Sequence, residues 1–320
     1  MENGTLDCLS VGILVADHIC APIDRMPDAG DLVLTDELQL TIGGCASNAA
    51  VDMARVGVNV SVVGCVGDDS FGHFIIDALR AANVETSGIH LLSGVGTSGT
   101  LIVNVRGQDR RFIHTLGANA RMSATHIPFD RVKLARVLYV GGYLLMPALE
   151  QDALAELFQQ ARAAGVRTVL DVVLPGPGDY MPRLERLLPH TDVFLPNTDE
   201  ARVITGLADP RAQADRLHAA GAGAAVITCG GEGTVLVGDG LRLFAAPYRM
   251  PFVGATGAGD AFDAGYITGM LRGSDPRMCL AWGSALGASC VRAIGATESV
   301  FTRDEAEAFL RDNPLQVSEW

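Results

Sequence analysis

A short glycine-rich loop precedes an aspartate that could act as a base. Gly257, Ala258 and Gly259 stand directly before Asp260, and a helix-like segment follows. The first N–H groups of a helix lack intrahelical partners and carry partial positive charge, so small residues there let a phosphate approach closely. Asp260 would repel that phosphate, which suggests another task, accepting the proton of an attacking hydroxyl. An ordinary helix-start aspartate after a glycine turn is the alternative interpretation.

The segments around this loop alternate between strand-like and helix-like patterns. Apolar runs predict strands at residues 9–16, 60–66, 137–142, 166–173, 192–196 and 224–230. Helical patterns are predicted at residues 46–56, 69–82, 148–164, 198–206, 210–220, 259–272, 276–293 and 302–312. This alternation predicts an α/β fold in which a mainly parallel central sheet has helices on both faces. Ligands should bind at the carboxyl ends of its strands.

Two segments break the alternation near its beginning. Residues 18–42 and 88–116 lack helical periodicity and carry short β-like pieces, at 32–42, 100–105 and 110–115. These pieces could pair into a small β-sheet lid over one end of the main sheet, which a phosphotransferase needs to exclude water. A β-insertion without that role is the alternative. We expect a single domain over residues 1–320 that includes this lid.

The composition excludes several classes of protein. The chain has 320 residues and a net charge of −13, which argues against general nucleic-acid binding. No apolar run approaches the roughly 18–20 residues of a membrane helix, and the N-terminus lacks a secretory pattern. We therefore expect a cytoplasmic protein with no membrane partner. The seven cysteines include no C-x-x-C pair, so neither a disulfide framework nor a structural zinc site is expected.

Several nucleotide-binding motifs are absent or out of context. The run Gly94–Gly99 matches a dinucleotide-binding fingerprint by its letters, but a strand follows it where a helix is required. Lys133 is the only lysine, and no Gly-Lys pair exists. Phosphate-binding loops and protein kinases both place a lysine on the phosphates of ATP, so both classes are excluded.

Four further short motifs accompany the glycine-rich loop. They are Gly43-Gly44-Cys45-Ala46-Ser47-Asn48, Pro196-Asn197-Thr198-Asp199-Glu200, Thr228-Cys229-Gly230 and Gly295-Ala296. In this order, and over nearly the whole chain, they resemble the signatures of the ribokinase-like, or PfkB-type, carbohydrate kinase family. The resemblance implies a ribokinase-like three-layer α/β/α sandwich with a small β-sheet lid. It also implies ATP as the phosphoryl donor and Mg²⁺ as the metal.

The resemblance gives the glycine-rich loop and the acceptor site defined roles. Asp260 would be the catalytic base, and an anion hole would come from Gly257, Ala258 and Gly259. The acceptor would be bound by four residues of the N-terminal part: Asp17, Gly43, Gly44 and Asn48. A solvated strand-end aspartate and a helix-start asparagine are the alternatives for Asp17 and Asn48.

The resemblance also assigns the nucleotide and metal ligands. Asn197 would bind the phosphates, and Glu200 would bind the water shell of Mg²⁺, a hard cation that prefers oxygen ligands. The two residues are three apart at a predicted helix start, so they share a face. Their alternative interpretation is a helix cap and its capping-box partner. Thr228 and Gly230 would contact the nucleotide phosphates.

The chain departs from the family pattern in the loop and in the acceptor site. Gly254 stands where relatives that use K⁺ have a carboxylate, so we expect weak or absent K⁺ activation. Val15, Cys45 and either Tyr143 or Gly142 stand where ribokinases proper have polar groups, which makes ribose doubtful. Val15, Cys45 and Tyr143 would make the pocket somewhat apolar. Asp31 stands near an expected lysine, which disfavours phosphorylated sugars, although Arg25 or Arg111 could compensate.

We therefore expect an ATP-dependent kinase that phosphorylates a hydroxyl of a small sugar. A nucleoside kinase of the same family is the alternative, and a phosphosugar kinase or a catalytically silent sugar-binding regulator is a further one. The partners would be small molecules. The resemblance also implies a possible homodimer formed through the lid.

Overall fold

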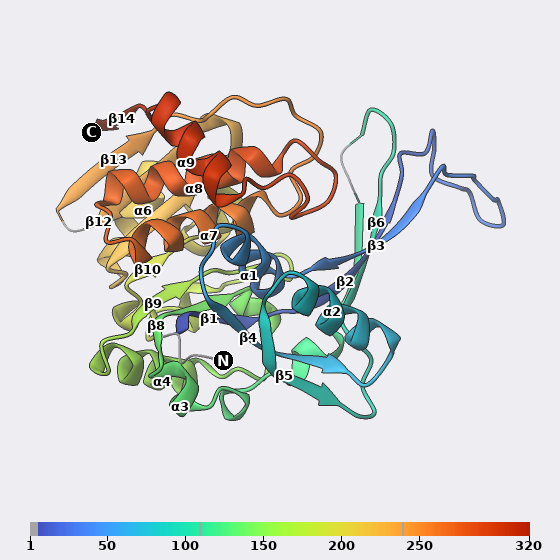
Figure 1. The fold of residues 1–320 in the computed structure, drawn as a ribbon, viewed down its shortest axis with the longest axis horizontal. Coiled ribbons are helices and arrows are strands. Elements are labelled where there is room, and N and C mark those ends of the chain that lie inside the picture. The colour runs from blue at the N-terminus through green and yellow to red at the C-terminus, as the bar shows by residue number, and fades with distance from the viewer. Residues whose placement is uncertain (1–5, 109–110, 239) are drawn as a thin grey trace.

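The computed structural model describes residues 6–108, 111–238 and 240–320. Its described strands form a ten-stranded sheet and a separate four-stranded sheet (Figure 1). In spatial order the large sheet contains β14 (Val317–Glu319), β13 (Leu241–Ala245), β12 (Thr234–Gly238), β11 (Ala224–Thr228), β10 (Val193–Phe194), β9 (Arg167–Leu170), β8 (Ala135–Gly141), β1 (Leu6–Gly12), β4 (Val60–Gly67) and β5 (Glu85–Leu92). Pairing from β11 to β5 is parallel, and β12, β13 and β14 add an antiparallel edge.

Helices cover both faces of the large sheet, as the sequence predicts. One face carries α1 (Cys45–Arg55), α2 (Ser70–Ala81), α7 (Ala258–Leu271), α8 (Pro276–Cys290) and α9 (Arg303–Asp312), and the other α3 (Phe129–Val132), α4 (Gln151–Ala163), α5 (Thr198–Thr205) and α6 (Pro210–Ala219). Short 3₁₀ helices lie at Gly117–Arg121, Ala124–His126, Tyr143–Leu145, Met181–Arg183, Leu188–His190 and Gly230–Glu232. Central strands such as β4 are buried along their whole length because both of their faces are covered.

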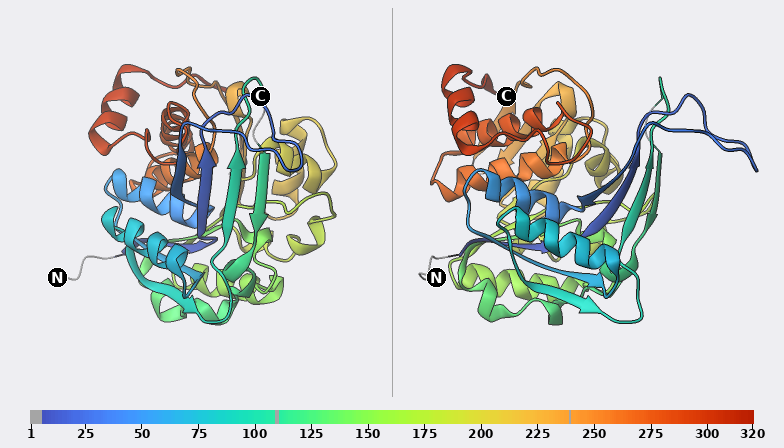
Figure 2. Two further views of the ribbon diagram at one scale, coloured as in Figure 1. Left: turned by 90° about the vertical axis from the view of Figure 1, so that its right-hand side faces the viewer. Right: turned by 45° about the vertical axis from the view of Figure 1, so that its right-hand side comes forward.

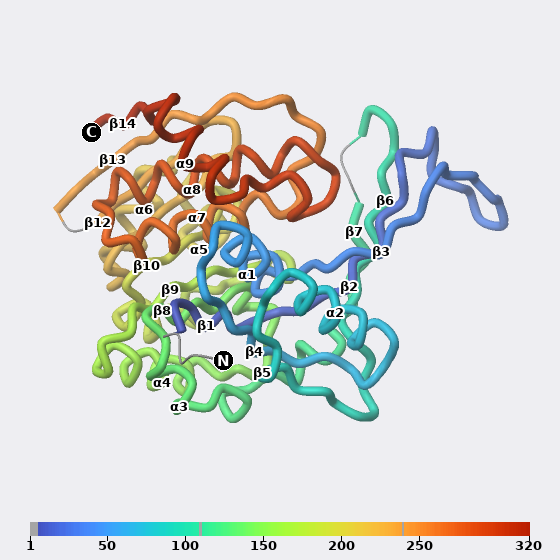
Figure 3. The backbone as a smooth tube through the Cα atoms, viewed as in Figure 1, coloured from blue at the N-terminus to red at the C-terminus, as the bar shows by residue number. Residues whose placement is uncertain are grey.

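The four-stranded sheet is the predicted lid. Its strands lie in the order β3 (Leu38–Gly43), β2 (Val15–Cys20), β6 (Gly99–Val103) and β7 (Arg111–Thr115), and Figure 2 shows them side by side. β2 and β6 are parallel, whereas the other two pairs are antiparallel. The tube in Figure 3 shows that the lid stands away from the body of the large sheet, with long connections at its outer end. The sheet therefore projects over one end of the α/β body.

The boundaries of the lid differ from those predicted. The predicted strand at 9–16 is two strands, because the chain leaves β1 at Gly12 and enters the lid at Val15. Gly12 has φ 149° and packs so closely on Gly141 that a Cβ atom would lie 2.1 Å from the carbonyl oxygen of that residue. Residues 88–92 belong to β5 of the large sheet, and residues 32–37 form no strand. Arg110, of the predicted strand at 110–115, lies outside the described residues.

The parallel strands place their carboxyl ends at one edge of the large sheet. Asp171 follows β9, Asn197 comes soon after β10, and Thr228 ends β11. The lid begins three residues after the end of β1, at the same edge. Residues far apart in the chain therefore meet where ligands of open α/β sheets bind. Among the described residues, no helix has the length and apolar character needed to cross a membrane.

Candidate active site

The N-terminus of α7 is open because glycine forms its cap. Gly257 is the N-cap residue, with φ 78°, a left-handed conformation that favours glycine. A Cβ atom on Gly257 would lie 2.5 Å from the carbonyl oxygen of Ala296, so the close packing also requires glycine. Gly259, one residue into the helix, is exposed, and a Cβ atom there would meet nothing within 4 Å. Open space therefore lies beside the start of α7 at Gly259, as an anion-binding helix start requires.

The loop before α7 is fixed to the segment after α8. The Cys290 thiol lies 3.0 Å from the carbonyl oxygen of Ala296 and 3.3 Å from that of Thr256. The backbone N–H of Gly254 donates to the carbonyl oxygen of Val291 at 3.2 Å. These contacts hold the loop of residues 254–257, which we call the phosphate loop, in one position.

Asp260 lies in the first turn of α7 and is contacted by α1. The amide Nδ2 of Asn48 donates to its Oδ2 at 2.8 Å. Burial raises the pKa of Asp260, while hydrogen bonds from Asn48 and from the Cys45 thiol oppose that rise. Asn48 is 3% exposed, and its Oδ1 atom has no hydrogen-bond partner among the described residues. The site thus combines a partly exposed carboxylate with a buried acceptor atom that is available to a ligand.

Asp17 faces the same region from the lid. It is 7% exposed and shares one face of the lid with its register partners Thr41 and Thr100. Burial raises the pKa of Asp17 to about 6; the Thr100 hydroxyl lowers it and the charge of Asp260 raises it. Gly43 packs directly on this carboxylate, because a Cβ atom there would lie 2.0 Å from its Oδ2.

Gly44 completes the turn that carries the chain from the lid into α1. It is the N-cap of α1 with φ 93°, and a Cβ atom there would lie 2.4 Å from the carbonyl oxygen of Ile13. The pair Gly43-Gly44 thus lets the turn pass close to the first strands. Asn48, in the first turn of α1, then points to Asp260. The structure therefore brings together Asp17, Gly43, Gly44, Asn48 and Asp260.

Asp171 is a buried member of the cluster that the sequence analysis missed. It is 8% exposed, and its Oδ2 accepts the N–H of Gly142 at 3.0 Å. Burial, and next the charge of Asp260, raise the pKa of Asp171 to about 7. The Cys45 thiol lies between the carboxylates of Asp171 and Asp260. The only signal in the sequence is one aspartate inside the apolar run predicted as a strand at 166–173, which is too weak to single it out.

Asn197 and Glu200 form the capping box that was their alternative interpretation. Asn197 Oδ1 accepts the N–H groups of Asp199 and Glu200, both at 2.9 Å, and Glu200 Oε2 accepts the N–H of Asn197 at 2.9 Å. Burial, and then the charges of Asp171 and Asp260, raise the pKa of Glu200 well above its usual range. Glu200 is thus part of the same acidic environment, although its local task is to cap α5.

Thr228 lies beside this cap at the end of β11. Its N–H donates to the carbonyl oxygen of Pro196 at 3.2 Å, and an isolated parallel bridge pairs it with Asn197. Gly230 follows in an exposed turn with φ 54°, where a Cβ atom would meet nothing within 4 Å. The segments at 197–200 and 228–230 are therefore neighbours at the carboxyl edge of the sheet.

Comparison with known proteins shows the family to which the chain belongs. The sequence profile of the pfkB family of carbohydrate kinases matches residues 5–303, which is most of the chain. This chain belongs to the pfkB family. The match confirms the predicted resemblance and the predicted enzyme class, a phosphotransferase that acts on carbohydrates.

Members of the pfkB family with different names are similar to this chain. A ribokinase of Haemophilus influenzae is 27% identical over 306 residues, which cover 94% of this chain and 97% of that protein. A 5-dehydro-2-deoxygluconokinase of Clostridium tetani is 24% identical over 335 residues, with coverage of 99% and 96%. A solved E. coli structure assigned as ribokinase II, in complex with ATP and Mg²⁺, has a TM-score of 0.82. It is 22% identical, covers 96% of this chain and 99% of that chain, and confirms the predicted fold.

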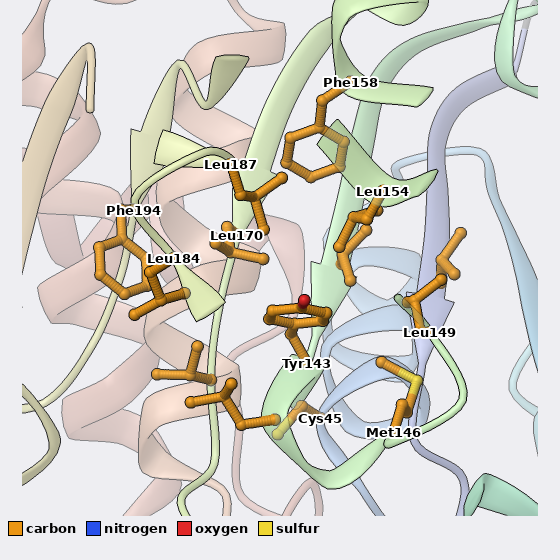
Figure 4. Close-up of a cluster of buried hydrophobic side chains, with 14 of the residues drawn as sticks. Cys45, Tyr143, Met146, Leu149, Leu154, Phe158, Leu170, Leu184, Leu187 and Phe194 are labelled. Carbon is orange, nitrogen blue, oxygen red and sulfur yellow. The ribbon is translucent and has the colours of Figure 1, made fainter. Parts of the chain in front are cut away.

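Two residues expected in the acceptor pocket of this pfkB member lie in the core instead. Figure 4 shows the Tyr143 ring packed among Leu154, Leu170 and other apolar side chains of the cluster next to α4. Val15 is also buried. Of the three replacements, Cys45 is the one whose ligand atom is grouped with those of Asp171 and Asp260.

Proposed function

We propose that this chain transfers the γ-phosphoryl group of ATP to a hydroxyl of a small sugar, with Asp260 as the general base. The observation that carries the proposal is the position of Asp260 in the first turn of a helix whose N-cap is glycine. A carboxylate there lies beside the place where a phosphate binds. Because burial raises its pKa, Asp260 is a stronger proton acceptor than an exposed aspartate.

The start of α7 supplies the complementary positive potential. Gly259 leaves room for the transferring group. We assign the anion hole to Gly257, Ala258 and Gly259, and the N–H groups of the first turn would donate to the oxygens of that group. The phosphate loop cannot shift easily, because the Cys290 thiol and the N–H of Gly254 tie it to the end of α8. Donors held in advance stabilise developing charge without reorganisation during the reaction.

The residues at the other end of the site fit Mg²⁺ and the nucleotide. Burial raises the pKa of Glu200 most, and the charges of Asp171 and Asp260 add to that rise. A cation there would offset the repulsion from these two carboxylates. Asn197 and Glu200 would bind the phosphates and the hydrated metal, and Thr228 and Gly230 would border the phosphate chain. When bound, Mg²⁺ would neutralise the charge of the phosphates.

The acceptor would lie between Asp17, Asn48 and Asp260. Asp17 accepts hydrogen bonds from hydroxyl groups, and the unpartnered Oδ1 of Asn48 accepts one more. The site gathers three carboxylates, and the charge of Asp260 adds to burial in raising the pKa values of Asp17 and Asp171. A neutral polyol suits this environment better than a sugar phosphate. Arg25, which could have bound a phosphate, pairs with Asp31 at 2.9 Å.

A nucleoside is the second candidate acceptor. A cavity of about 480 Å³ lies between the lid and the phosphate loop, lined by Ile19 and Ile102 from the lid and by Phe252 and Val253 from the loop side. Ile19 is on the same face of β2 as Asp17, two residues further along. A sugar held by Asp17 could therefore extend an apolar base into this cavity.

An acceptor panel tests both candidates. Purified protein with ATP and Mg²⁺ is assayed for ADP release with neutral sugars, nucleosides and sugar phosphates, and the Asp260→Asn variant controls for contaminating kinases. Release with neutral sugars supports the leading proposal, and release with nucleosides alone replaces it. Protein that binds ATP but releases no ADP with any acceptor would instead be a silent sugar-binding regulator.

The lid also carries a surface that suits a homodimer. Leu40, Leu101 and Ile113 lie in register on the face of the lid opposite to Asp17, and all three are exposed. We propose that a second copy covers them. Light scattering of the wild type and of Leu101→Asp tests this assignment: a dimer that dissociates in the variant supports it, and a monomeric wild type contradicts it.

A further inference from the structure

Three side chains from distant parts of the chain gather around one point beside the base. Cys45 is the first residue of α1, Asp171 follows β9, and Asp260 is in the first turn of α7. One ligand atom from each, the thiol sulfur and two carboxylate oxygens, lies within 4.8 Å of the other two. The thiol, with its single proton, lies close enough to interact with both carboxylates. None of the roles proposed above uses Cys45 or Asp171.

The surroundings of this cluster favour a cation. Cys45 and Asp171 are buried, and their ligand atoms and one of Asp260 lie within 4.8 Å of one another. Burial, and next the charge of Asp260, raise the pKa values of both groups. An independent observation comes from Asn48, whose amide already contacts Asp260 and whose Oδ1 is buried without a partner among the described residues. The cluster of one thiol and two carboxylates thus has beside it a buried amide oxygen that no described residue satisfies.

The identity of the ligand atoms selects the cation. Mg²⁺ and Ca²⁺ are hard cations that bind oxygen, whereas Zn²⁺ accepts cysteine sulfur together with carboxylate oxygen. We propose that Cys45, Asp171 and Asp260 form a binding site for one Zn²⁺ ion, separate from the Mg²⁺ proposed at Glu200. On binding, the Cys45 thiol loses its proton to solvent, because the thiolate is the metal ligand. A fourth position stays open to water, since three protein ligands do not complete a tetrahedron.

Occupancy of this site would inhibit phosphoryl transfer. A Zn²⁺ ion on Asp260 takes the electron pair that would otherwise accept the acceptor's proton. Inhibition, unlike the binding itself, rests on the proposed function of Asp260. The expected pattern is competition between Zn²⁺ and the acceptor.

Cobalt and zinc titrations test the site in the absence of nucleotide. Co²⁺ is the spectroscopic probe, because cobalt bound to a cysteine thiolate gives a charge-transfer absorption that carboxylate sites lack. The test variants are Cys45→Ser and Asp171→Asn. Cys229→Ser is the matched control, since Cys229 is the one cysteine of the seven that is not buried and is the natural place for non-specific binding. Circular dichroism verifies that each variant is folded.

We expect one ion per chain in the wild type, with the thiolate band present. The band should persist in Cys229→Ser and disappear in Cys45→Ser, and Zn²⁺ should bind at least tenfold more weakly to folded Cys45→Ser and Asp171→Asn in calorimetry. A band that persists in Cys45→Ser, or a wild type without a band, overturns the site.

An activity measurement separates this inference from the proposed function. With an acceptor found in the panel, Zn²⁺ at saturating occupancy should lower wild-type ADP release at least tenfold and leave any residual rate of Cys45→Ser unchanged relative to its own metal-free rate. Full wild-type turnover with the site occupied contradicts the inhibitory role. If no acceptor is phosphorylated, the proposed function fails, whereas the metal titration still decides the site.

Discussion

Two of the helices that start at the carboxyl edge of the large sheet, α5 and α7, are capped in opposite ways. In α5, Asn197 and Glu200 satisfy three backbone N–H groups with their own side chains. In α7, the N-cap is Gly257, which has no side chain to offer, and the first turn borders open space. The difference shows that the N–H groups at a helix start are available to an anion only where no side chain of the protein caps them. The side chains of α5 satisfy the N–H groups at its start, whereas α7 has no side-chain cap, which suits the phosphate proposed there.

Removing the carboxylate of α7 should have the largest effect. We expect Asp260→Asn to reduce turnover by ~10²–10⁴-fold, the range for loss of a general base, while ATP binding persists. ADP release and calorimetric ATP titration measure the two quantities. The control is Asp199→Asn, an exposed first-turn aspartate of α5 that pairs with Arg202. Equal losses in the two variants would contradict a special role for α7.

Filling the open space at α7 should separate stability from activity. Gly259→Ala adds a methyl group that meets no protein atom. We therefore expect the free energy of unfolding to stay the same or to rise by roughly 0.5–1 kcal/mol. The same methyl group would displace the phosphate, and we expect kcat/KM to fall ~10–10²-fold. Gly257→Ala provides the contrast, because its backbone clash and positive φ should reduce stability as well. Unimpaired kinetics of Gly259→Ala would show that no phosphate binds there.

The hydrogen bond from Asn48 of α1 to Asp260 should set the pH at which kcat/KM falls on the acid side. Asp260 must be ionised to act as a base, so activity should fall as the pH drops through its raised pKa. The amide of Asn48 stabilises the ionised form. Removing that donor in Asn48→Ala should raise the pKa further and move the acid limb upward by ~0.5–1 pH unit. The pH dependence of kcat/KM measures the shift, and an unmoved limb would contradict this assignment.

Removing the side-chain cap of α5 should mainly lower the free energy of unfolding. We expect Asn197→Ala to lower the free energy of unfolding by about 1 kcal/mol, as the loss of an N-cap does. Asn197→Asp keeps the capping oxygen and serves as the control. If Asn197 also binds phosphate, both variants should raise the KM for ATP, although only the first loses stability. Urea unfolding and ATP kinetics distinguish the two roles.

The smallest effect is expected from monovalent cations. Gly254 supplies no carboxylate to the phosphate loop, and its N–H is bonded to Val291. Replacing Na⁺ with K⁺ at constant ionic strength should therefore leave turnover nearly unchanged. A several-fold activation by K⁺ would contradict this expectation.

The helices were predicted well because their signals are local. The predicted helix at 198–206 and the observed α5 agree closely, since its cap and periodicity lie within one stretch of chain. The bend at Gly12 was missed because the apolar run of residues 9–16 continues through it without a change in composition. Asp171 was missed because its neighbours, Cys45 and Asp260, come from distant segments. Tyr143 was placed by analogy with relatives, but its ring fills the core.

The thiol of Cys290 has a consequence for how the enzyme would respond to its surroundings. It lies between two backbone carbonyl oxygens, one in the phosphate loop and one after α8. Because this thiol is a side chain of the protein, its contacts with the two segments do not depend on the ions in the solvent. We therefore expect the loop to keep its shape without a dissolved monovalent cation.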